Sequence, residues 1–573
     1  MRTSKHIIYQ TMPRLFGNYN ENLVKNGSIE DNGCGKFNSY TPKALNAIRE
    51  LGVTHIWYTG VIAHSTCTDY TAYDIPKDHH AIVKGKAGSP YAIKDYYDVD
   101  PDLAENIPNR MLEFEELVKR THKADMKVII DFIPNHVSRS YHSIMKPLYI
   151  DNLGQHDNTN IAFSASNNFY YLPGQSLELH FGVEEDHFGY SEFPAKVTGN
   201  DCFSANPGRN DWYETIKLNY GVDYLHGGSK HFSPVPDTWK KMLNILLFWL
   251  EKDIDGFRCD MAEMVPVEFW NWAIPRVKSR KNVCFIAEIY NHSLYQDYIN
   301  KGHFDYLYDK VGTYDTLRNV ICGKAPLADL AQSRQAIENI KEHTLFFLEN
   351  HDEQRIASDF FAGDARAGIP GVAYMATHST SPIMIYNGQE LGEKGMDEEG
   401  FSGKDGRTSI FDYRSMDSVR KWANNGRFDG GMLSEEQLEL RNIYKLILNI
   451  SKKEKAILYG NFYDLAYCNN DNQHFPSEYL MAYLRKYENE LLVIFINFDK
   501  VEHYFRVHIP KNAFDVLQIP DNKVSFAREM LSGKESVCSL TYTCPFEGTI
   551  PALSSKIFKL NYSSNLYLTD FNR

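Results

Sequence analysis

Residues 255–260 read DGFRCD, a short apolar strand pattern in which Arg258 stands two positions before Asp260. Either charge, if it were buried alone, would lose its hydration without compensation. Side chains two positions apart on a strand point to the same side, so we expect the two to pair with each other or to serve one site. A nearby guanidinium lowers the pKa of a carboxyl group, which predicts that Asp260 stays ionised.

Stretches of the same kind recur along the chain and alternate with helical patterns. They end in polar or charged residues and cover 5–14, 52–60, 126–136, 253–260, 282–290, 304–309, 343–352 and 381–390. A helix is predicted over 236–252, with Asp237 as its N-cap. Eight strand–helix units predict an α/β protein with a closed (β/α)₈ barrel, in which the carboxyl ends of the strands build the active site.

Two regions depart from this alternation. Residues 137–212 follow the third strand, are rich in Asn, Ser, Tyr and Phe, and form an insertion that the family resemblance described below identifies as domain B; a loop of this length is usually functional. From residue 461 the pattern indicates antiparallel strands separated by turn residues, which predicts a C-terminal β-sandwich domain over 461–573. The barrel is then formed by 1–136 and 213–460.

Composition narrows the functional classes. The chain has 573 residues, is 43% hydrophobic and has a formal net charge of −13, so we expect two or three folded units and no nucleic-acid partner. Its nine cysteines form no CxxC pair, which favours a cytoplasmic protein without disulfides or a zinc site, or a periplasmic or secreted one if a signal peptide has been trimmed. No apolar run reaches the ~18 residues of a membrane helix, so no membrane partner is expected.

Several acids stand at predicted strand ends. They are Asp131, Asp260, Glu288 and Asp352, and His136 and His351 accompany them. A single acid in this position is usually a cap or a solvated terminus, whereas acids on different strands of one barrel converge on its mouth. Paired carboxylates are the groups that hydrolyse glycosidic bonds, one as nucleophile and the other as acid and then base.

Four motifs in this order, DFIPNH (131–136), DGFRCD (255–260), IAEIY (286–290) and FLENHD (347–352), resemble the signature regions of glycoside hydrolase family 13, the α-amylase family. The resemblance covers the barrel, domain B and the sandwich. It implies a retaining hydrolase of α-1,4-glucans such as starch, glycogen or maltodextrin. The roles that it implies are nucleophile for Asp260, general acid/base for Glu288, third catalytic acid for Asp352, and substrate binding for Arg258, His136, His351 and Tyr91.

Other positions bear on substrate and metal. The aromatic residues Trp212, Tyr170 and Tyr171 are candidates for outer sugar subsites, with core packing as the alternative. Ala92 stands where family α-glucosidases carry an aspartate that closes the pocket, which favours an open cleft.

Two lysines, Lys217 and Lys36, stand where the resemblance would place acidic ligands of a metal. An ammonium group does not bind Ca²⁺, so no metal site is predicted and a structural calcium is not favoured. No cofactor is required for the chemistry.

Three alternatives remain open at this point. A transferase of the same fold would pass the sugar to a hydroxyl group instead of water. An exo-acting α-glucosidase would differ in the shape of its pocket. A non-catalytic carbohydrate-binding protein would have lost the acids, yet Asp260, Glu288 and Asp352 are all present.

Overall fold

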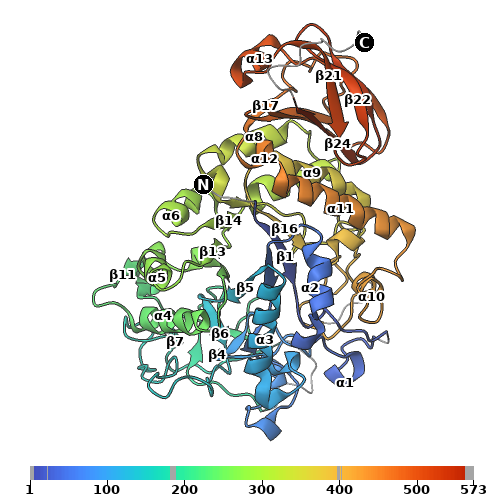
Figure 1. The fold of residues 1–573 in the computed structure, drawn as a ribbon. Helices are drawn as coiled ribbons and strands as arrows, with labels where there is room; N and C mark the ends of the chain where they lie inside the picture. Colours follow the sequence, from blue (N-terminus) through green and yellow to red (C-terminus); the bar gives the residue numbers. More distant parts are fainter. Residues whose placement is uncertain (1–4, 22, 181–188, 397–400, 402, 562–573) are drawn as a thin grey trace.

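The computed structural model describes residues 5–21, 23–180, 189–396, 401 and 403–561. Its centre is a sheet of eight strands in the order β15-β14-β13-β12-β5-β2-β1-β16, and each neighbouring pair is parallel. A parallel bridge between Phe346 and Ile383 joins its two edges, so the sheet closes into a barrel (Figure 1).

The eight predicted barrel strands are confirmed, each within its predicted range. They are β1 (Ile7–Thr11), β2 (His55–Tyr58), β5 (Lys127–Phe132), β12 (Gly256–Cys259), β13 (Cys284–Ala287), β14 (Tyr306–Tyr308), β15 (Thr344–Leu345) and β16 (Ile383–Tyr386).

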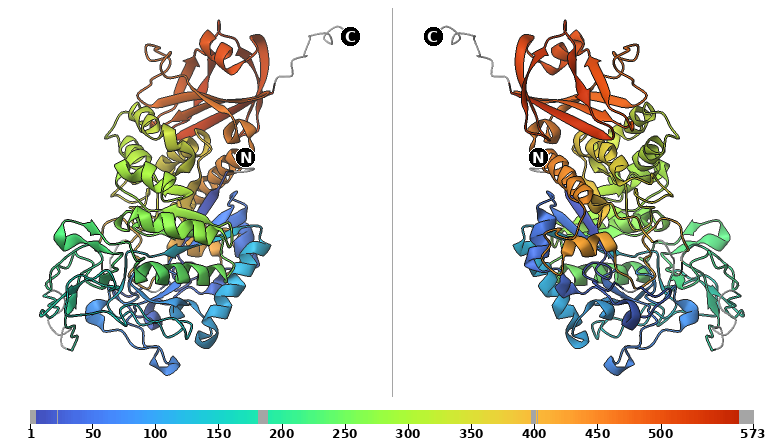
Figure 2. Two further views of the ribbon diagram at one scale, coloured as in Figure 1. Left: turned by 90° about the vertical axis from the view of Figure 1, so that its left-hand side faces the viewer. Right: turned by 90° about the vertical axis from the view of Figure 1, so that its right-hand side faces the viewer.

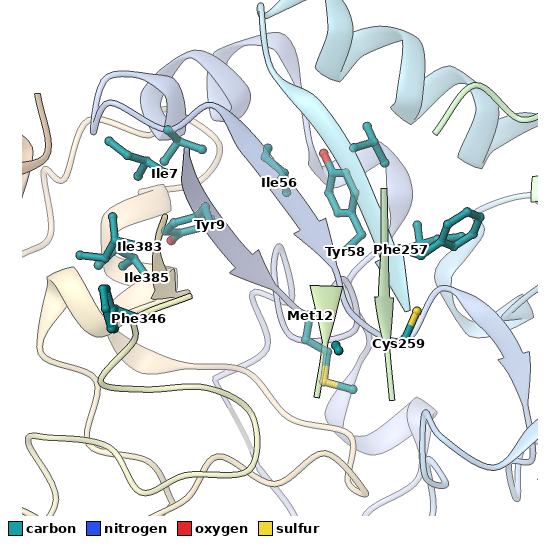
Figure 3. Packing of buried hydrophobic residues seen from close by; sticks show 14 of the residues in the cluster. Ile7, Tyr9, Met12, Ile56, Tyr58, Phe257, Cys259, Phe346, Ile383 and Ile385 are labelled. Atoms are coloured by element: carbon teal, nitrogen blue, oxygen red, sulfur yellow. The ribbon is translucent and has the colours of Figure 1, made fainter. Parts of the chain in front are cut away.

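Each barrel strand contributes side chains to two cores. Ile7 and Tyr9 of β1 belong to the large core between the barrel and its helices, whereas Ile8 belongs to the smaller core inside the barrel. On β16, Ile383 and Ile385 lie with the outer set (Figure 3). Successive side chains of a strand point to opposite faces, and here both faces are buried. Most strand positions are therefore apolar, and polar residues are concentrated toward the strand ends.

Helices surround the barrel. The principal ones are α2 (Pro42–Arg49), α3 (Arg110–Lys123), α4 (Asp237–Leu250), α5 (Val267–Lys278), α6 (Tyr295–Asn300), α7 (Asp315–Ile321), α8 (Asp329–Ala336), α9 (Gly368–Thr377), α10 (Asp417–Ala423) and α11 (Glu435–Lys453). The prediction that Asp237 caps α4 is wrong. Asp237 is the first helical residue, Pro236 precedes it, and its carboxylate lies 2.9 Å from Lys241 Nζ one turn later.

The region after β5 forms the predicted insertion with little regular structure. The antiparallel pair of β6 (His136–Ser138) and β9 (Thr215–Lys217) forms its base, and β7 (Tyr171–Leu172) pairs with β8 (Ala195–Lys196) further out. Another antiparallel pair, β3 (Ile62–His64) with β4 (Ile93–Val99), follows β2. The insertion and the C-terminal domain lie at opposite ends of the molecule (Figure 2).

The C-terminal region contains the predicted β-sandwich. Six antiparallel strands form one sheet: β17 (Asn461–Asp464), β18 (Leu480–Tyr487), β19 (Glu490–Asn497), β24 (Ser554–Asn561), β21 (Asn522–Glu529) and β22 (Glu535–Leu540). The second sheet pairs β20 (His503–Val507) with β23 (Phe546–Ile550). Phe495 and Phe505 stack between the two sheets at 4.1 Å between ring centroids. The end of the predicted domain, 562–573, lies outside the described residues.

The sandwich also packs onto the barrel. Tyr483 and Ile494 belong to the same buried cluster as the barrel's outer core, and Tyr483 Oη lies 2.5 Å from Thr377 Oγ1 at the end of α9. Buried Arg485 donates hydrogen bonds to the backbone carbonyls of Ala456 and His378, which belong to the barrel region. The two units therefore share one continuous interior.

All nine cysteines are free thiols. Among the described residues, none of the helices is both long enough and apolar enough to cross a bilayer.

Candidate active site

Three acids meet at the carboxyl end of the barrel. Asp260 directly follows β12, Glu288 directly follows β13, and Asp352 lies in the segment after β15. All three line a cavity of about 290 Å³, together with Tyr91 and His136. The strand ends that the sequence singled out thus converge on one site.

Arg258 lies behind this cavity and holds its carboxylates. The guanidinium is fully buried, with Nη1 2.7 Å from Asp260 Oδ1 and Nη2 2.8 Å from Glu288 Oε2. Asp131, its register partner on β5, lies 3.4 Å from Nη1. The expected pairing of Arg258 with Asp260 is confirmed, and the same guanidinium also forms an ion pair with Glu288.

Three aromatic rings surround the guanidinium. Its central carbon lies 5.2 Å from the ring centroid of Trp57, 5.4 Å from that of Tyr91 and 5.5 Å from that of Tyr308. The Arg258 Nε–H also donates to Tyr308 Oη at 3.2 Å. Cation–π contacts with desolvated rings and this hydrogen bond fix the guanidinium in one orientation.

Protonation of the acids follows from these contacts. Burial, and after it the neighbouring Glu288 carboxylate, raise the pKa of Asp260 well above its ordinary value, although Arg258 acts against both. The sequence analysis predicted the effect of Arg258, which does lower this pKa, but it took no account of burial or of Glu288, which act in the opposite direction. Arg258 therefore partly offsets burial at Asp260 and favours the carboxylate form that a nucleophile needs.

Asp352 behaves differently. Burial raises its pKa, but His351, Arg258 and Arg407 together outweigh burial and lower the pKa to about 2. His351 Nε2 lies 3.0 Å from Asp352 Oδ2. Asp352 is therefore ionised at neutral pH, when it can accept hydrogen bonds from sugar hydroxyl groups.

The two histidines occupy different positions. His136 faces the cavity, its ring 5.1 Å from that of Trp212, and burial followed by Lys217 and Lys84 lowers its pKa to about 3. His351 lies behind the wall, with Nε2 2.5 Å from Tyr91 Oη. His136 is thus neutral at neutral pH, and His351 positions Tyr91 and Asp352.

Of the three aromatic residues that were candidates for outer sugar subsites, one lines the cavity and two are packed in the core. Trp212 lines the cavity. Tyr170 and Tyr171 are 1% and 3% exposed; Tyr170 donates to the carbonyl of Val222, and Tyr171 donates to Asp157. These two tyrosines pack inside the insertion and do not line the cavity.

Ala92 does not shape the cavity. It is 1% exposed, its N–H donates to the carbonyl of Ser89, and the cavity wall nearby is formed by Ser89, Ile410 and Phe411. The shape of the cleft therefore does not follow from Ala92, because this residue is buried and does not line the cavity.

Several cavity residues were missed by the sequence analysis: Lys84, Ser89, Glu214, Thr215, Met261, Tyr290, Ile410 and Phe411. Only Tyr290 had a local signal. It stands two positions after Glu288, and its hydroxyl group donates to Glu288 Oε1 at 2.7 Å. Thr215 opens the short strand β9, and the others come from loops, where no periodicity marks the side that faces the site.

The two lysines at the suspected metal positions form contacts of their own. Lys217 is 1% exposed, and its ammonium group lies 2.5 Å from Asp201 Oδ1 and 3.0 Å from Asn135 Oδ1. Lys36 Nζ donates to the carbonyl of Asp102 at 2.5 Å. At each position a lysine ammonium group binds oxygen atoms that could otherwise act as Ca²⁺ ligands, so these residues do not fit Ca²⁺.

Removing divalent cations with EDTA is therefore expected to leave activity unchanged and to shift the melting temperature by less than roughly 5 °C, which for a chain of 573 residues that unfolds as one unit corresponds to about 6 kcal/mol. Activity and thermal unfolding before and after dialysis against EDTA test this. A larger loss that added Ca²⁺ restores would contradict it.

The barrel, its insertion, the sandwich and the acids at the strand ends define the class of this protein as a (β/α)₈-barrel enzyme that acts on glycosidic bonds. Comparison with known proteins identifies the family. The sequence model of the α-amylase catalytic domain matches residues 13–459, so the chain belongs to the α-amylase family, glycoside hydrolase family 13.

Its relatives are distant. Alpha-amylase 3 of Dictyoglomus thermophilum is 23% identical over 457 residues, which span 76% of this chain and 79% of the relative. Neopullulanase 2 of Thermoactinomyces vulgaris is 21% identical, over 68% of this chain and 57% of its own length.

Solved structures share the fold. A maltogenic α-amylase, AmyB, from Thermotoga neapolitana superposes with a TM-score of 0.62 at 19% identity, covering 97% of this chain and 99% of that one. The α-amylase of Geobacillus thermoleovorans, solved with acarbose, has a TM-score of 0.63 at 19% identity and covers 98% and 99%.

Proposed function

We propose that this protein is a retaining glycoside hydrolase that cleaves α-1,4-glucosidic bonds of starch-, glycogen- or maltodextrin-type glucans. The observation that carries the proposal is the shared guanidinium, which holds Asp260 and Glu288 at 2.7 and 2.8 Å on its two terminal nitrogens. Carboxyl groups held so close together favour the ~5–5.5 Å separation of retaining enzymes over the ~6.5–9.5 Å that inverting enzymes need for an intervening water.

The steps follow from the positions of the acids. Asp260 attacks the anomeric carbon while Glu288 gives its proton to the glycosidic oxygen, which breaks the bond and leaves the glycone esterified to Asp260. Water then attacks the same carbon while Glu288 removes its proton, and Asp260 leaves as a carboxylate. In this scheme Asp352 accepts hydrogen bonds from sugar hydroxyl groups, and His136, as a neutral ring, contacts the same sugar.

Location and partners are part of the proposal. Nine free thiols are typical of a reducing compartment, which supports a cytoplasmic enzyme. A net charge of −13 supports a neutral glucan as partner and disfavours nucleic acid.

The stereochemistry of the product tests the mechanism. Maltoheptaose incubated with the enzyme in an NMR tube is expected to yield products whose new reducing ends are initially α, because two inversions restore the configuration. The β-anomer then grows only at the rate of mutarotation. An initial β-anomer would contradict the retaining mechanism, and intact maltoheptaose would contradict the proposed substrate class.

A further inference from the structure

The cavity has two distinguishable sides. In the closed ring of strands, β13, which carries Glu288, stands across the barrel from β1, and β1 is flanked by β2 and β16. The general acid protonates the leaving group, so the leaving group lies on the side of β13. The loops after β2 and β16 therefore bound the glycone, the part of the substrate that becomes attached to the enzyme.

A charged pair lies on this glycone side. Lys84, in the connection between β3 and β4, places its ammonium group 3.0 Å from Oε1 of Glu214, which directly precedes β9. Both residues line the catalytic cavity, and they are 8% and 4% exposed. The ammonium group also lies over the rings of Tyr213 and Phe411, at 5.4 and 6.0 Å from their centroids.

The pair has unused hydrogen-bonding capacity. Within the described part of the chain, Glu214 Oε2 has no hydrogen-bond partner although it is buried. An ammonium group has three donors, and Glu214 Oε1 engages only one of those on Lys84. A buried carboxylate oxygen without a partner is costly, and a hydroxyl group of a bound ligand would remove that cost.

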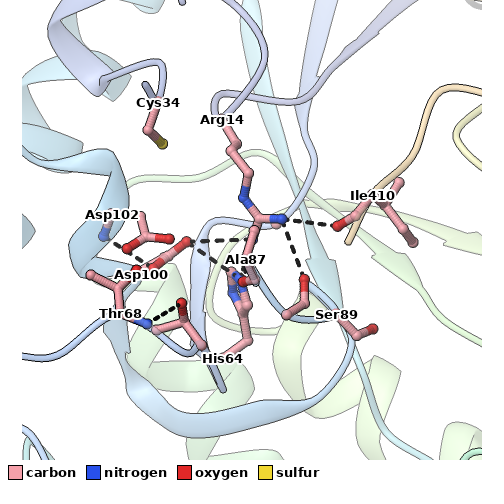
Figure 4. A network of polar contacts seen from close by, with 12 residues as sticks. Arg14, Cys34, His64, Thr68, Ala87, Ser89, Asp100, Asp102 and Ile410 are labelled. Carbon is pink, nitrogen blue, oxygen red and sulfur yellow. Dashed lines mark hydrogen bonds and ion pairs between the residues drawn. The ribbon is translucent and has the colours of Figure 1, made fainter. Parts of the chain in front are cut away.

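The wall that carries Lys84 is firmly held. Buried Arg14, in the loop after β1, donates to the carbonyls of Ile410 at 2.9 Å and Ala87 at 3.1 Å (Figure 4). The Ala87 N–H in turn donates to the carbonyl of Phe411 at 3.1 Å. The loops after β2 and β16 are thus tied to each other, which fixes the position of the pair before substrate arrives.

We propose that Lys84 and Glu214 are specificity-determining residues that bind neighbouring hydroxyl groups of the glycone. One hydroxyl oxygen accepts a hydrogen bond from the Lys84 ammonium group, and the adjacent hydroxyl group donates to Glu214 Oε2. This inference rests on the proposed glycoside hydrolysis and adds the residues that select the sugar on the side away from the leaving group.

Glycosyl fluorides isolate this side of the site, because their leaving group contains no sugar. For Glu214→Gln and Lys84→Met in the full chain, kcat/KM for α-glucosyl and α-maltosyl fluoride is measured beside that for maltoheptaose. We expect a fall of roughly 10-fold or more on at least α-maltosyl fluoride, the size expected for a lost hydrogen bond to a charged group.

Lys94→Met is the matched control. Lys94 on β4 forms another buried pair, with Nζ 2.9 Å from Asp78 Oδ2, but neither residue lines the catalytic cavity. This variant is expected to lower the melting temperature as Lys84→Met does, while kcat/KM for the fluorides stays unchanged. If Lys84→Met does not fold, Glu214→Gln, which keeps the size of the side chain, carries the test.

The outcomes separate this proposal from the one on which it rests. Folded variants that keep wild-type kcat/KM on both fluorides overturn the role of the pair, and so does a fall confined to maltoheptaose, which would place the pair on the leaving-group side. A wild-type enzyme that hydrolyses neither the fluorides nor maltoheptaose overturns the proposed function itself.

Discussion

Asp260→Asn and Glu288→Gln are each expected to lower kcat by roughly 10⁴-fold or more, the size seen when one member of a catalytic unit is removed. An amide in place of the Asp260 carboxylate would be a poor nucleophile, and an amide in place of the Glu288 carboxyl group would have no acidic proton to give to the leaving oxygen. Each replacement leaves Arg258 paired with the other carboxylate, so the melting temperature should move by only a few degrees. Steady-state kinetics on maltoheptaose and thermal unfolding measure both.

Glu263→Gln is the control for these variants. Glu263 lies three positions after Asp260 and accepts a hydrogen bond from the backbone of Asn291, but it does not line the cavity. Its replacement should leave kcat within about twofold of wild type, since surface substitutions rarely perturb a site that they do not touch. Near-normal turnover in a folded Asp260→Asn or Glu288→Gln variant would refute the assignment of the catalytic acids.

Arg258→Met is expected to damage both stability and catalysis. It removes the cation that Asp260, Glu288 and Asp131 share, and the loss of one partner from a buried ion pair typically costs about 3–5 kcal/mol. Because Arg258 lowers the pKa of Asp260, its loss should raise that pKa further. A smaller fraction of the nucleophile is then ionised at a given pH, so the acid limb of the kcat/KM profile should move to higher pH.

Arg258→Lys separates charge from geometry. The ammonium group keeps the positive charge but cannot bind two carboxylates along parallel directions as the planar guanidinium does. We expect it to recover part of the stability and to return the acid limb toward the wild-type position, with kcat still reduced. An acid limb that is the same in wild type and Arg258→Met would show that the guanidinium does not set the protonation of the nucleophile.

The fold could be predicted because each strand of the barrel produces a recognisable pattern in the local sequence. Each barrel strand is buried on both faces and therefore forms a short apolar run, and each run ends where the chain meets the cavity. Arg258 and Asp260 were recognisable because their separation by two places them on the same side of one strand. Their positions depend only on the strand that carries them.

The remaining site features depend on contacts between distant segments. Arg258 and Glu288 are 30 positions apart, and nothing near either one indicates that they share an ion pair. Lys84, Glu214 and Phe411 come from three separate loops, and nothing in the local sequence shows that Ala92 is buried away from the cavity that Tyr91 lines. Local sequence indicates which residues are polar, but the packing of loops decides which of them face the substrate.

The interior that the barrel shares with the C-terminal sandwich constrains how this protein can be divided. Tyr483, Ile494 and Arg485 lie in the seam, so a chain ending near Glu454 would present bare apolar surface and would leave the backbone carbonyl of His378, just after α9, without the hydrogen bond from Arg485. Such a fragment is a candidate for aggregation rather than a minimal enzyme. The catalytic barrel thus relies on the sandwich to cover part of its own core, at the end of the molecule away from the insertion (Figure 2).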